Sequence, residues 1–323
     1  MKAIVYTQNG NLDALKIKDI PKPVPKKNQV LIHVKASTLN ILDYQRFKNN
    51  KKIPLSIRIM NRMQGSIGRP LGADISGIVV GWGENVSKFK IGDEVFAKTL
   101  GTFPAGGWAE YAVVDKDQVG IKPQKLSFEQ AAAIPTSFET ALGSVRKAKV
   151  KKDQQVMIYG SSGGVGLFAV QIAKAMGAIV TGVCSTRNVQ IAKTLGCDSV
   201  IDYKKENFTQ SKQKFDAIIG VNGSNPISSY KKLLTDNGIF VGVGMHQIFK
   251  TMLNAPFSKH VDFFADPMFP QKDYLMVAQK LANEGKLDPY IDEIYQAKDI
   301  KQAINYVITK HPHGKVAVDM NFD

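Results

Sequence analysis

The feature that most constrains this chain is a glycine-rich turn between an apolar strand and an amphipathic helix. An apolar run over residues 156–159 enters a turn with a glycine at every third position: Gly160, Gly163 and Gly166. Over residues 165–176 apolar side chains then recur at helical spacing on one face. Residues 178–184 read as the next strand. The pattern predicts a βαβ unit whose helix N-terminus suits a pyrophosphate.

The end of the second strand bears on which dinucleotide could bind. A ribose 2′-hydroxyl is usually held by a carboxylate at this place, but residues 184–188 contain none and include Ser185, Thr186 and Arg187. Hydroxyls and a guanidinium suit a 2′-phosphate, which favours NADPH over NADH. In the alternative interpretation Ser185 or Thr186 caps the next helix and Arg187 is solvated. The glycine spacing also differs from the commoner G-x-G-x-x-G pattern.

Composition narrows the class of protein. The 323 residues suffice for two domains. No apolar run reaches membrane-spanning length, and Met1 leads directly into a predicted strand over residues 2–6, so we predict a cytoplasmic protein. Cysteine occurs only as Cys184 and Cys197, both predicted to be buried or half-buried. Two thiols cannot form a four-cysteine zinc site, and we predict no metal.

The net charge of +15 (43 basic minus 28 acidic residues) raises the question of an anionic partner. The basic residues are spread over the whole chain, with local concentrations at residues 48–52 and 146–152. They are not accompanied by an aromatic-interleaved RNA motif. The pattern favours a solvated basic surface that helps to attract an anionic cofactor over a nucleic-acid site.

The first 120 residues read as a β-rich, barrel-like domain with closely spaced short strands. A turn at Asn40 starts a short helix, in which Asn40 and Asp43 could be cap residues. The basic segment 48–69 lacks periodicity and is expected to be a mobile loop. Ser127 and Gln130 form a predicted capping box for a helix that ends near residue 135.

From residue 156 onward, strands and helices alternate at lengths typical of a doubly wound parallel sheet, with one of the helices predicted over residues 228–234. Residues 245–270 interrupt this rhythm with five phenylalanines, which we interpret as an aromatic cluster outside the sheet. Such a cluster is most often in the core or at a subunit interface, and only sometimes forms a substrate lid. A helix over residues 273–284 and a closing strand–helix–strand over residues 290–320 complete the chain, and the latter is expected to return to the first domain.

Laid out in this order, the chain resembles the zinc-free quinone oxidoreductase branch of the medium-chain dehydrogenase/reductase superfamily over nearly its whole length. The segments that carry the resemblance are Gly72-x-Asp74-x-Ser76-Gly77, Asn85-Val86-x-x-Phe89-Lys90-x-Gly92-Asp93-x-Val95, Gly106-Gly107-x-Ala109-Glu110-Tyr111, Ser161-Ser162-Gly163-Gly164-Val165-Gly166, Ile201-Asp202-Tyr203 and Gly314-Lys315-Val316. The chain departs from the family at Asn40-Ile41-Leu42-Asp43, where Asn-Pro-x-Asp is common, and at residues 221–224.

The resemblance implies an α/β fold made of a GroES-like catalytic domain and a Rossmann nucleotide-binding domain. We expect the former to span residues 1–124 and 287–323, and the latter residues 125–286. It implies that Asn40 and Tyr44 line the nicotinamide and substrate, although Tyr44 could equally be a core residue. The implied cofactor-binding residues are Thr140, Ser162, Gly163, Gly164, Val165, Ser185, Arg187, Tyr203, Gly244 and His313.

The resemblance also implies the reaction, which is hydride transfer from NADPH to a quinone or to an α,β-unsaturated carbonyl. Without a metal, hydrogen-bond donors must stabilise the developing oxyanion. The candidates are the Asn40 amide, the Tyr44 hydroxyl, the cofactor ribose hydroxyl and water. A homodimer is the expected assembly. Two alternatives stay open: a 2-enoyl thioester reductase, and an NADPH-regulated nucleic-acid-binding protein with little turnover.

Overall fold

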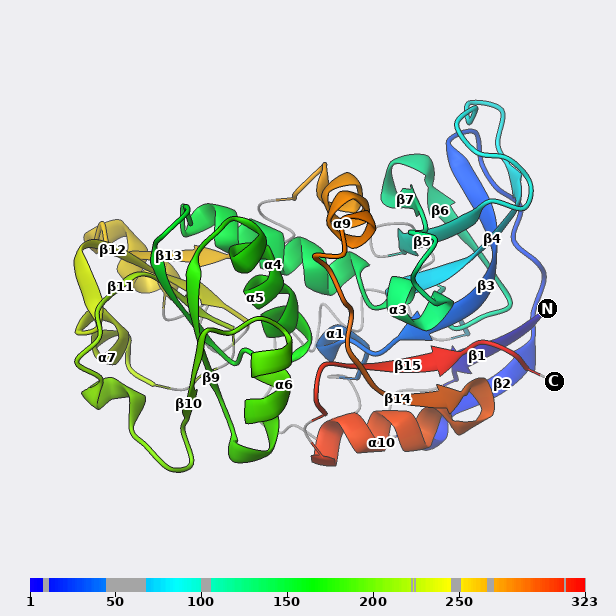
Figure 1. Cartoon of the computed structure of the whole chain (residues 1–323). Coiled ribbons are helices and arrows are strands. Elements are labelled where there is room, and N and C mark those ends of the chain that lie inside the picture. Colours follow the sequence, from blue (N-terminus) through cyan, green and yellow to red (C-terminus); the bar gives the residue numbers. More distant parts are fainter. Residues whose placement is uncertain are drawn as a thin grey trace. The chain divides into compact units, whose positions relative to one another are not determined.

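The computed structural model describes residues 1–7, 12–44, 68–99, 106–221, 223, 225–244, 251–265, 270–310 and 312–322, apart from the side chains of Leu42 and Tyr44. Its elements are coloured along the chain in Figure 1. The segment 48–67, expected to be a mobile loop, lies outside these residues. The chain divides into two compact units, Met1–Thr136 with Ile291–Asp323 and Ser137–Tyr290.

The first unit is built mainly from antiparallel strands, as alternating apolar and polar residues predict. Strands β1 (Lys2–Tyr6) and β2 (Leu15–Asp19) pair with each other. A seven-stranded sheet runs β14-β15-β3-β4-β5-β7, with β6 also paired to β3. Its strands are β3 (Gln29–Thr38), β4 (Asp74–Trp82), β5 (Glu94–Lys98), β6 (Tyr111–Asp115), β7 (Val119–Ile121), β14 (Ile291–Gln296) and β15 (Lys315–Asp319).

Helices of the first unit are short. They are α1 (Ile41–Tyr44), α3 (Phe128–Ala132) and α10 (Ile300–Lys310). The capping box of α3 is confirmed, because the Ser127 hydroxyl accepts from the Gln130 N–H and the Gln130 side chain accepts from the Ser127 N–H. Helix α3 packs on β3, β4 and β15, and the unit therefore extends to Thr136, beyond the boundary at residue 124 expected from sequence.

The second unit contains a six-stranded parallel sheet in the order β10-β9-β8-β11-β12-β13, and the predicted fold class is confirmed. The strands are β8 (Gln155–Tyr159), β9 (Ile179–Cys184), β10 (Ser199–Asp202), β11 (Phe215–Gly220), β12 (Leu234–Val243) and β13 (Val261–Phe264). The helices are α4 (Pro135–Lys147), whose first two residues belong to the first unit, α5 (Gly164–Ala175), α6 (Val189–Thr194), α7 (Ile227–Lys231) and α9 (Tyr274–Asn283).

Two expectations about the second unit are wrong. Phe263 and Phe264 do not belong to a cluster outside the sheet but lie in β13, the sheet's edge strand. Leu234 was expected to end a helix, whereas α7 ends at Lys231 and Leu234 begins β12. In both cases pairing with a neighbouring parallel strand overrides a local pattern that short elements specify poorly.

Candidate functional site

The glycine turn after β8 forms the cofactor-site candidate in the second unit. Gly160 adopts a φ of +85°, which glycine tolerates best, and turns the chain out of the strand. Gly163 is the N-cap of α5 and provides no capping side chain, so the first N–H groups of the helix, on Gly164 and Val165, have no N-cap side chain as acceptor. A 12-residue helix with an open N-terminus can bind an anion.

Ser162, in the same turn, is held by a residue that the sequence patterns did not single out. The Asn188 Nδ2 donates to the Ser162 Oγ at 2.6 Å, and both side chains are buried. Because the Ser162 oxygen accepts this bond, its own hydroxyl proton can be donated elsewhere. The Asn188 Oδ1 is buried and has no hydrogen-bond partner. In the sequence, the signal for this contact is an asparagine four residues after β9.

The residues expected at a 2′-phosphate lie at the ends of two neighbouring strands. Ser185 follows β9 and sits at the N-cap position of a 3₁₀ turn, Thr186–Asn188, but its side chain makes no cap bond. Exposed Arg187 lies in that turn. The Tyr203 N–H donates to the Cys184 carbonyl at 3.0 Å, which places Tyr203 beside the end of β9. Parallel strands end at one edge, so the structure places these three residues at the same edge of the sheet.

Tyr203 is also positioned through its ring. The ring is 43% exposed and stacks on Tyr159, the last residue of β8, with centroids 6.4 Å apart. The Lys204 amine lies 5.6 Å from the Tyr203 ring centroid. Gly244 comes after β12 at the same edge of the sheet, with a φ of +83°. This edge therefore combines an open helix N-terminus, hydroxyls and cations.

The remaining predicted site residues do not lie in the segments that follow these strands. Thr140 lies in α4, and His313 lies in the first unit, where its N–H donates to Asp292 at 3.1 Å and its Nδ1 is buried without a partner. Tyr44 is the last residue of α1, and its side chain is not among those that the structure describes. The structure thus places nine of the ten cofactor candidates in the second unit and His313 in the first. Eight of the nine lie in the segments that follow β8, β9, β10 and β12, and Thr140 lies in α4.

Asn40 is the candidate catalytic residue whose surroundings are best defined. It is buried at the end of β3, its amide Nδ2 donates to Asp74 at 2.9 Å, and its Oδ1 accepts from the Lys315 amine at 2.6 Å. The Asn40 N–H donates to the Asp43 carboxylate at 2.8 Å, so the side chain that caps α1 is that of Asp43. Asp74 and Lys315 occur in motifs noted above, each as the charged residue that begins a largely apolar strand.

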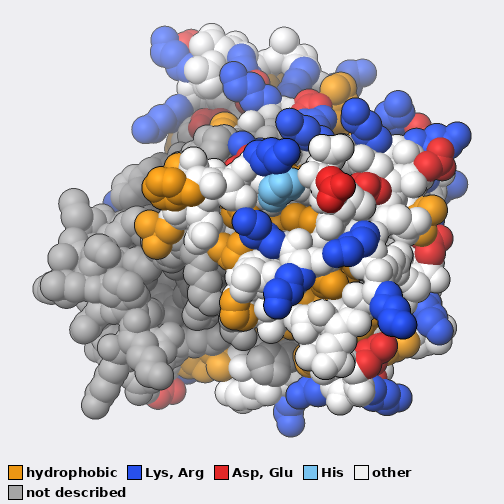
Figure 2. Space-filling view, turned by 90° about the vertical axis from the view of Figure 1, so that its left-hand side faces the viewer, with side chains coloured by type: hydrophobic (Ala, Val, Ile, Leu, Met, Phe, Trp, Pro, Cys, Tyr) orange, Lys and Arg blue, Asp and Glu red, His pale blue; other side chains and the backbone are white. Residues whose placement is uncertain are grey.

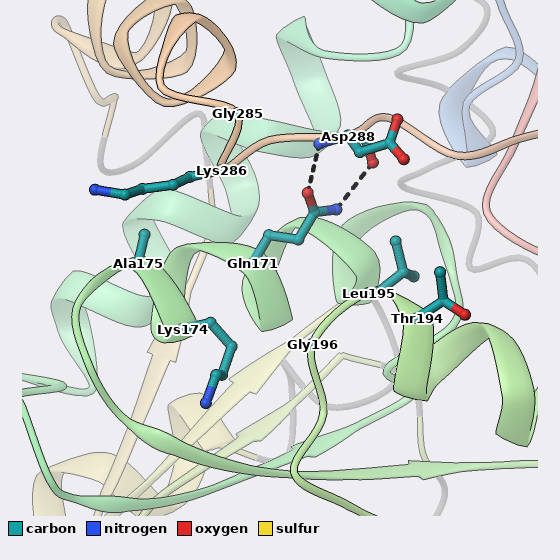
Figure 3. A pocket seen from close by; sticks show the side chains of 9 residues that line it. All are labelled: Gln171, Lys174, Ala175, Thr194, Leu195, Gly196, Gly285, Lys286 and Asp288. Carbon is teal, nitrogen blue, oxygen red and sulfur yellow. Dashed lines mark hydrogen bonds between the residues drawn. The ribbon is translucent and has the colours of Figure 1, made fainter.

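A depression elsewhere in the second unit does not make a second site. It has a volume of about 310 Å³ and lies between α5 and the segment after α9 (Figure 3). Its Lys174 amine pairs with Asp198 at 2.8 Å and its Lys286 amine with Glu284 at 2.8 Å. The Gln171 side chain brackets the Asp288 backbone, donating to the carbonyl at 3.0 Å and accepting from the N–H at 2.6 Å. The side chains of Lys174, Lys286 and Gln171 thus already form ion pairs or hydrogen bonds within the protein.

Two family models match the chain. One, described as an alcohol dehydrogenase GroES-like domain, matches residues 26–124, and the other, a zinc-binding dehydrogenase, matches residues 195–318. A quinone oxidoreductase from Sus scrofa is 33% identical over 97% of this chain and 95% of that protein. The chain belongs to the quinone oxidoreductase branch of the medium-chain dehydrogenase/reductase superfamily. It is an oxidoreductase of that family.

Other relatives extend the comparison. An NADPH-dependent alkenal/one oxidoreductase from Arabidopsis thaliana is 29% identical over 98% of this chain and 79% of that protein. A 2-methylene-furan-3-one reductase from Solanum lycopersicum is 37% identical over 68% of this chain, but the match spans only 56% of that longer protein. The solved quinone oxidoreductase from Coxiella burnetii has a TM-score of 0.85 and 32% identity, with 99% of each chain covered.

The zinc named in one family description does not fit the residues that the structure describes. Zinc sites are built from cysteine thiolates and histidines, and the two cysteines are buried, Cys184 at the end of β9 and Cys197 shortly before β10. Burial raises the pKa of both thiols, that of Cys197 to about 12, which disfavours the thiolate. Within the described ranges, no three His, Cys, Asp or Glu side chains are grouped for metal binding.

Proposed function

We propose that this oxidoreductase is an NADPH-dependent, zinc-independent reductase of quinones or α,β-unsaturated carbonyls. The observation that carries the proposal is the sheet edge in the second unit, where an open helix N-terminus is followed by Ser185, Arg187 and Tyr203 and no carboxylate occupies residues 185–188. A cation with hydroxyl groups suits a 2′-phosphate better than a free ribose hydroxyl. Among the relatives, the alkenal/one oxidoreductase is named as NADPH-dependent, and the quinone oxidoreductase is named for a quinone acceptor.

Each residue would have a defined task. The N–H groups of Gly164 and Val165 and the Ser162 hydroxyl would bind the pyrophosphate. Ser185, Arg187 and Tyr203 would hold the 2′-phosphate, with Thr140, Gly163, Gly244 and His313 as further cofactor contacts. The bound nicotinamide would supply a hydride to the acceptor. Asn40 and Tyr44 would donate hydrogen bonds to the acceptor oxygen, which then takes a proton from solvent.

The test is NADPH oxidation, followed at the nicotinamide absorbance with 1,4-benzoquinone, 9,10-phenanthrenequinone, an alkenal and an enoyl thioester as acceptors. NADH is run in parallel, together with a chelator control. We expect turnover with NADPH that the chelator does not change. A marked preference for the enoyl thioester would favour the acyl reductase alternative. Turnover that the chelator abolishes would contradict the zinc-independent assignment.

Nucleic-acid binding is the alternative from another class. Basic side chains are scattered over the described part of the face in Figure 2, with acidic and apolar side chains between them. Such dispersion does not favour a single polyanion track. Salt-sensitive RNA binding by a protein that turns over none of the acceptors would support that alternative and overturn the reductase proposal.

We also propose that the protein is a homodimer. Strand β13 is the last strand of the six-stranded sheet, and among the described strands its outer edge is unpaired. Phe257, just before β13, is 89% exposed, and Leu253 is exposed as well. An open edge beside exposed apolar side chains favours pairing with another chain. Sedimentation velocity at micromolar concentration would test this, and a monomer would refute it.

No helix in the described part of the chain could cross a membrane. The cytoplasmic location stays a prediction.

A further inference from the structure

Three buried polar side chains of the first unit form a continuous hydrogen-bonded chain. Lys315 opens β15, Asp74 opens β4, and Asn40 lies two residues after β3. The Lys315 amine donates to the Asn40 Oδ1 at 2.6 Å, and the Asn40 Nδ2 donates to Asp74 at 2.9 Å. All three side chains are buried. The Asn40 amide therefore bridges a cation and an anion.

This chain permits only one orientation of the amide. If the amide were flipped, its NH₂ group would face the ammonium of Lys315, which can only donate, and its oxygen would face the carboxylate of Asp74, which can only accept. Both contacts would then be repulsive inside the protein, where the effective dielectric constant is low. The two charged partners thus fix which side of Asn40 carries the donors.

Asp74 is anchored on its other oxygen. Its second carboxylate oxygen accepts from the Thr136 N–H at 3.1 Å and from the Thr136 hydroxyl at 2.6 Å. Burial raises the pKa of Asp74, and the nearby Lys315 and the bonds from Thr136 and Asn40 oppose this rise. Burial lowers the pKa of Lys315, and Asp74 and Asp43 oppose this fall. The charged form of Asp74 is therefore stabilised by Lys315, and that of Lys315 by Asp74.

Such an arrangement is costly as a means of stabilising the fold. Desolvation of two buried charges can exceed their attraction, and apolar residues of similar size often replace them without loss of stability. A buried ion pair with an amide inserted between its partners is better suited to orienting that amide. The primary amide has two N–H groups and Asp74 accepts from one of them, which leaves the other as a donor of fixed direction.

We propose that Lys315 and Asp74 are positioning residues that orient the second N–H of Asn40 toward the oxygen of the carbonyl acceptor. This inference rests on the proposed reductase function. Donation from Lys315 to the amide oxygen also polarises the amide, because hydrogen bonds in a chain strengthen one another. A preoriented, polarised donor stabilises the oxygen most when negative charge develops on it during hydride transfer.

The experiment is a double-mutant cycle on turnover with NADPH and the best acceptor, using Asn40→Ala, Lys315→Met and the double variant. Loss of one oxyanion donor lowers kcat about 100-fold, and we expect this loss for Asn40→Ala and a loss of about 10-fold or more for Lys315→Met. Because Lys315 acts through Asn40, the double variant should be no slower than Asn40→Ala, within about 2-fold. The Kd for NADPH should stay unchanged in all three.

A milder pair of variants keeps the test valid if Lys315→Met does not fold. Thr136→Val removes one hydroxyl donor to Asp74 and retains both charges. Its matched control is Thr38→Val, which removes an equivalent buried hydroxyl that donates to the Ala132 carbonyl at 3.0 Å, outside the chain of Asn40. We expect a lower kcat for Thr136→Val, about 3-fold or more, with an unchanged KM for NADPH, and wild-type kcat for Thr38→Val.

The outcomes separate the two proposals. A wild-type protein that turns over none of the acceptors would refute the reductase function and this inference with it. An active wild type whose folded Lys315 or Thr136 variant retains full kcat would refute the inference alone. Losses that multiply in the double variant, or equal losses in Thr136→Val and Thr38→Val, would show that these residues act only on the structure and would likewise refute it.

Discussion

The carbonyl oxygen of Gly160 lies 2.0 Å from the position that a Cβ on Gly166 would occupy. The first turn of α5 can cross the end of β8 this closely only because residue 166 has no side chain. The neighbouring Gly163 differs, since a Cβ there would lie 3.6 Å from the same oxygen, and its φ of −84° suits any residue. The turn therefore contains one glycine that packing requires and one that it does not.

Gly166→Ala should destabilise the protein by about 3 kcal/mol or more, because a backbone oxygen cannot move aside as a flexible side chain can. Gly163→Ala should cost less than about 1 kcal/mol, the usual range for losing a glycine N-cap. Denaturant unfolding monitored by fluorescence would measure both changes. Equal stability of the two variants would contradict this reading of the turn.

The Gly163→Ala variant also tests the cofactor site. If Gly163 is required for approach of the pyrophosphate, Gly163→Ala should weaken NADPH binding well beyond its small effect on stability. Titration calorimetry on the folded variant would measure the change in Kd. An unchanged Kd for NADPH would show that a methyl group at residue 163 does not contact the cofactor. It would therefore remove Gly163 from the proposed cofactor contacts.

Much of this architecture could be predicted from the sequence because the signals are local. The alternation of apolar strand, glycine turn and apolar-faced helix predicts β8, α5 and β9. The edge strand β13 escaped prediction, because a four-residue strand lies beside phenylalanines that are equally typical of a core cluster. Short strands are specified by their partner strand, here β12, which no local pattern reveals.

The chain of Lys315, Asn40 and Asp74 could be predicted only in part. Asn40 was singled out from the turn after β3, but its two charged partners are 34 and 275 residues away along the chain. Sequence periodicity gives no information on contacts of that separation. A charged residue at the start of a largely apolar strand was the available signal at both positions. Burial of an unpaired charge is costly, so each of these residues should have suggested a partner.

Arg187 should determine the preference between the two nicotinamide cofactors. It is exposed in the turn after β9. A hydrogen bond to a charged group contributes about 1.5–3 kcal/mol, so Arg187→Ala should weaken NADPH about 10- to 100-fold and leave NADH nearly unchanged. Kd values for both cofactors would be measured by fluorescence titration. Equal effects on the two cofactors would overturn the assignment of the 2′-phosphate site.

Arg146 and Asp273 join α4 to the start of α9 through two parallel bonds of 2.7 Å. Both side chains are about 40% exposed, so solvent screens the pair, and a double-mutant cycle with alanines should give a coupling of about 0.5–1 kcal/mol. The hydrogen bond from Arg146 lowers the pKa of Asp273. The coupling should therefore be present above about pH 4 and disappear as the pH falls through the folded-state pKa. A coupling that persists in acid would contradict this origin.

Cys197 should make the protein less stable in alkali. Burial raises the pKa of its thiol from 9.0 to about 12 in the folded state. Between these values the unfolded chain loses the proton and the folded chain keeps it, so the unfolded state binds fewer protons and stability falls as pH rises. One such group contributes a slope of up to about 1.4 kcal/mol per pH unit.

Cys197→Ala should remove that contribution, so that its free energy of unfolding depends less steeply on pH between 9 and 11 than that of the wild type. The comparison variant is Cys184→Ala, which removes a second buried thiol whose pKa is also raised by burial. It should flatten the dependence in the same direction. The native protein should also react slowly with a thiol reagent at pH 8 and expose both thiols only in denaturant. Fast reaction of Cys197 in the native state would show that its thiol is not protected as the structure indicates.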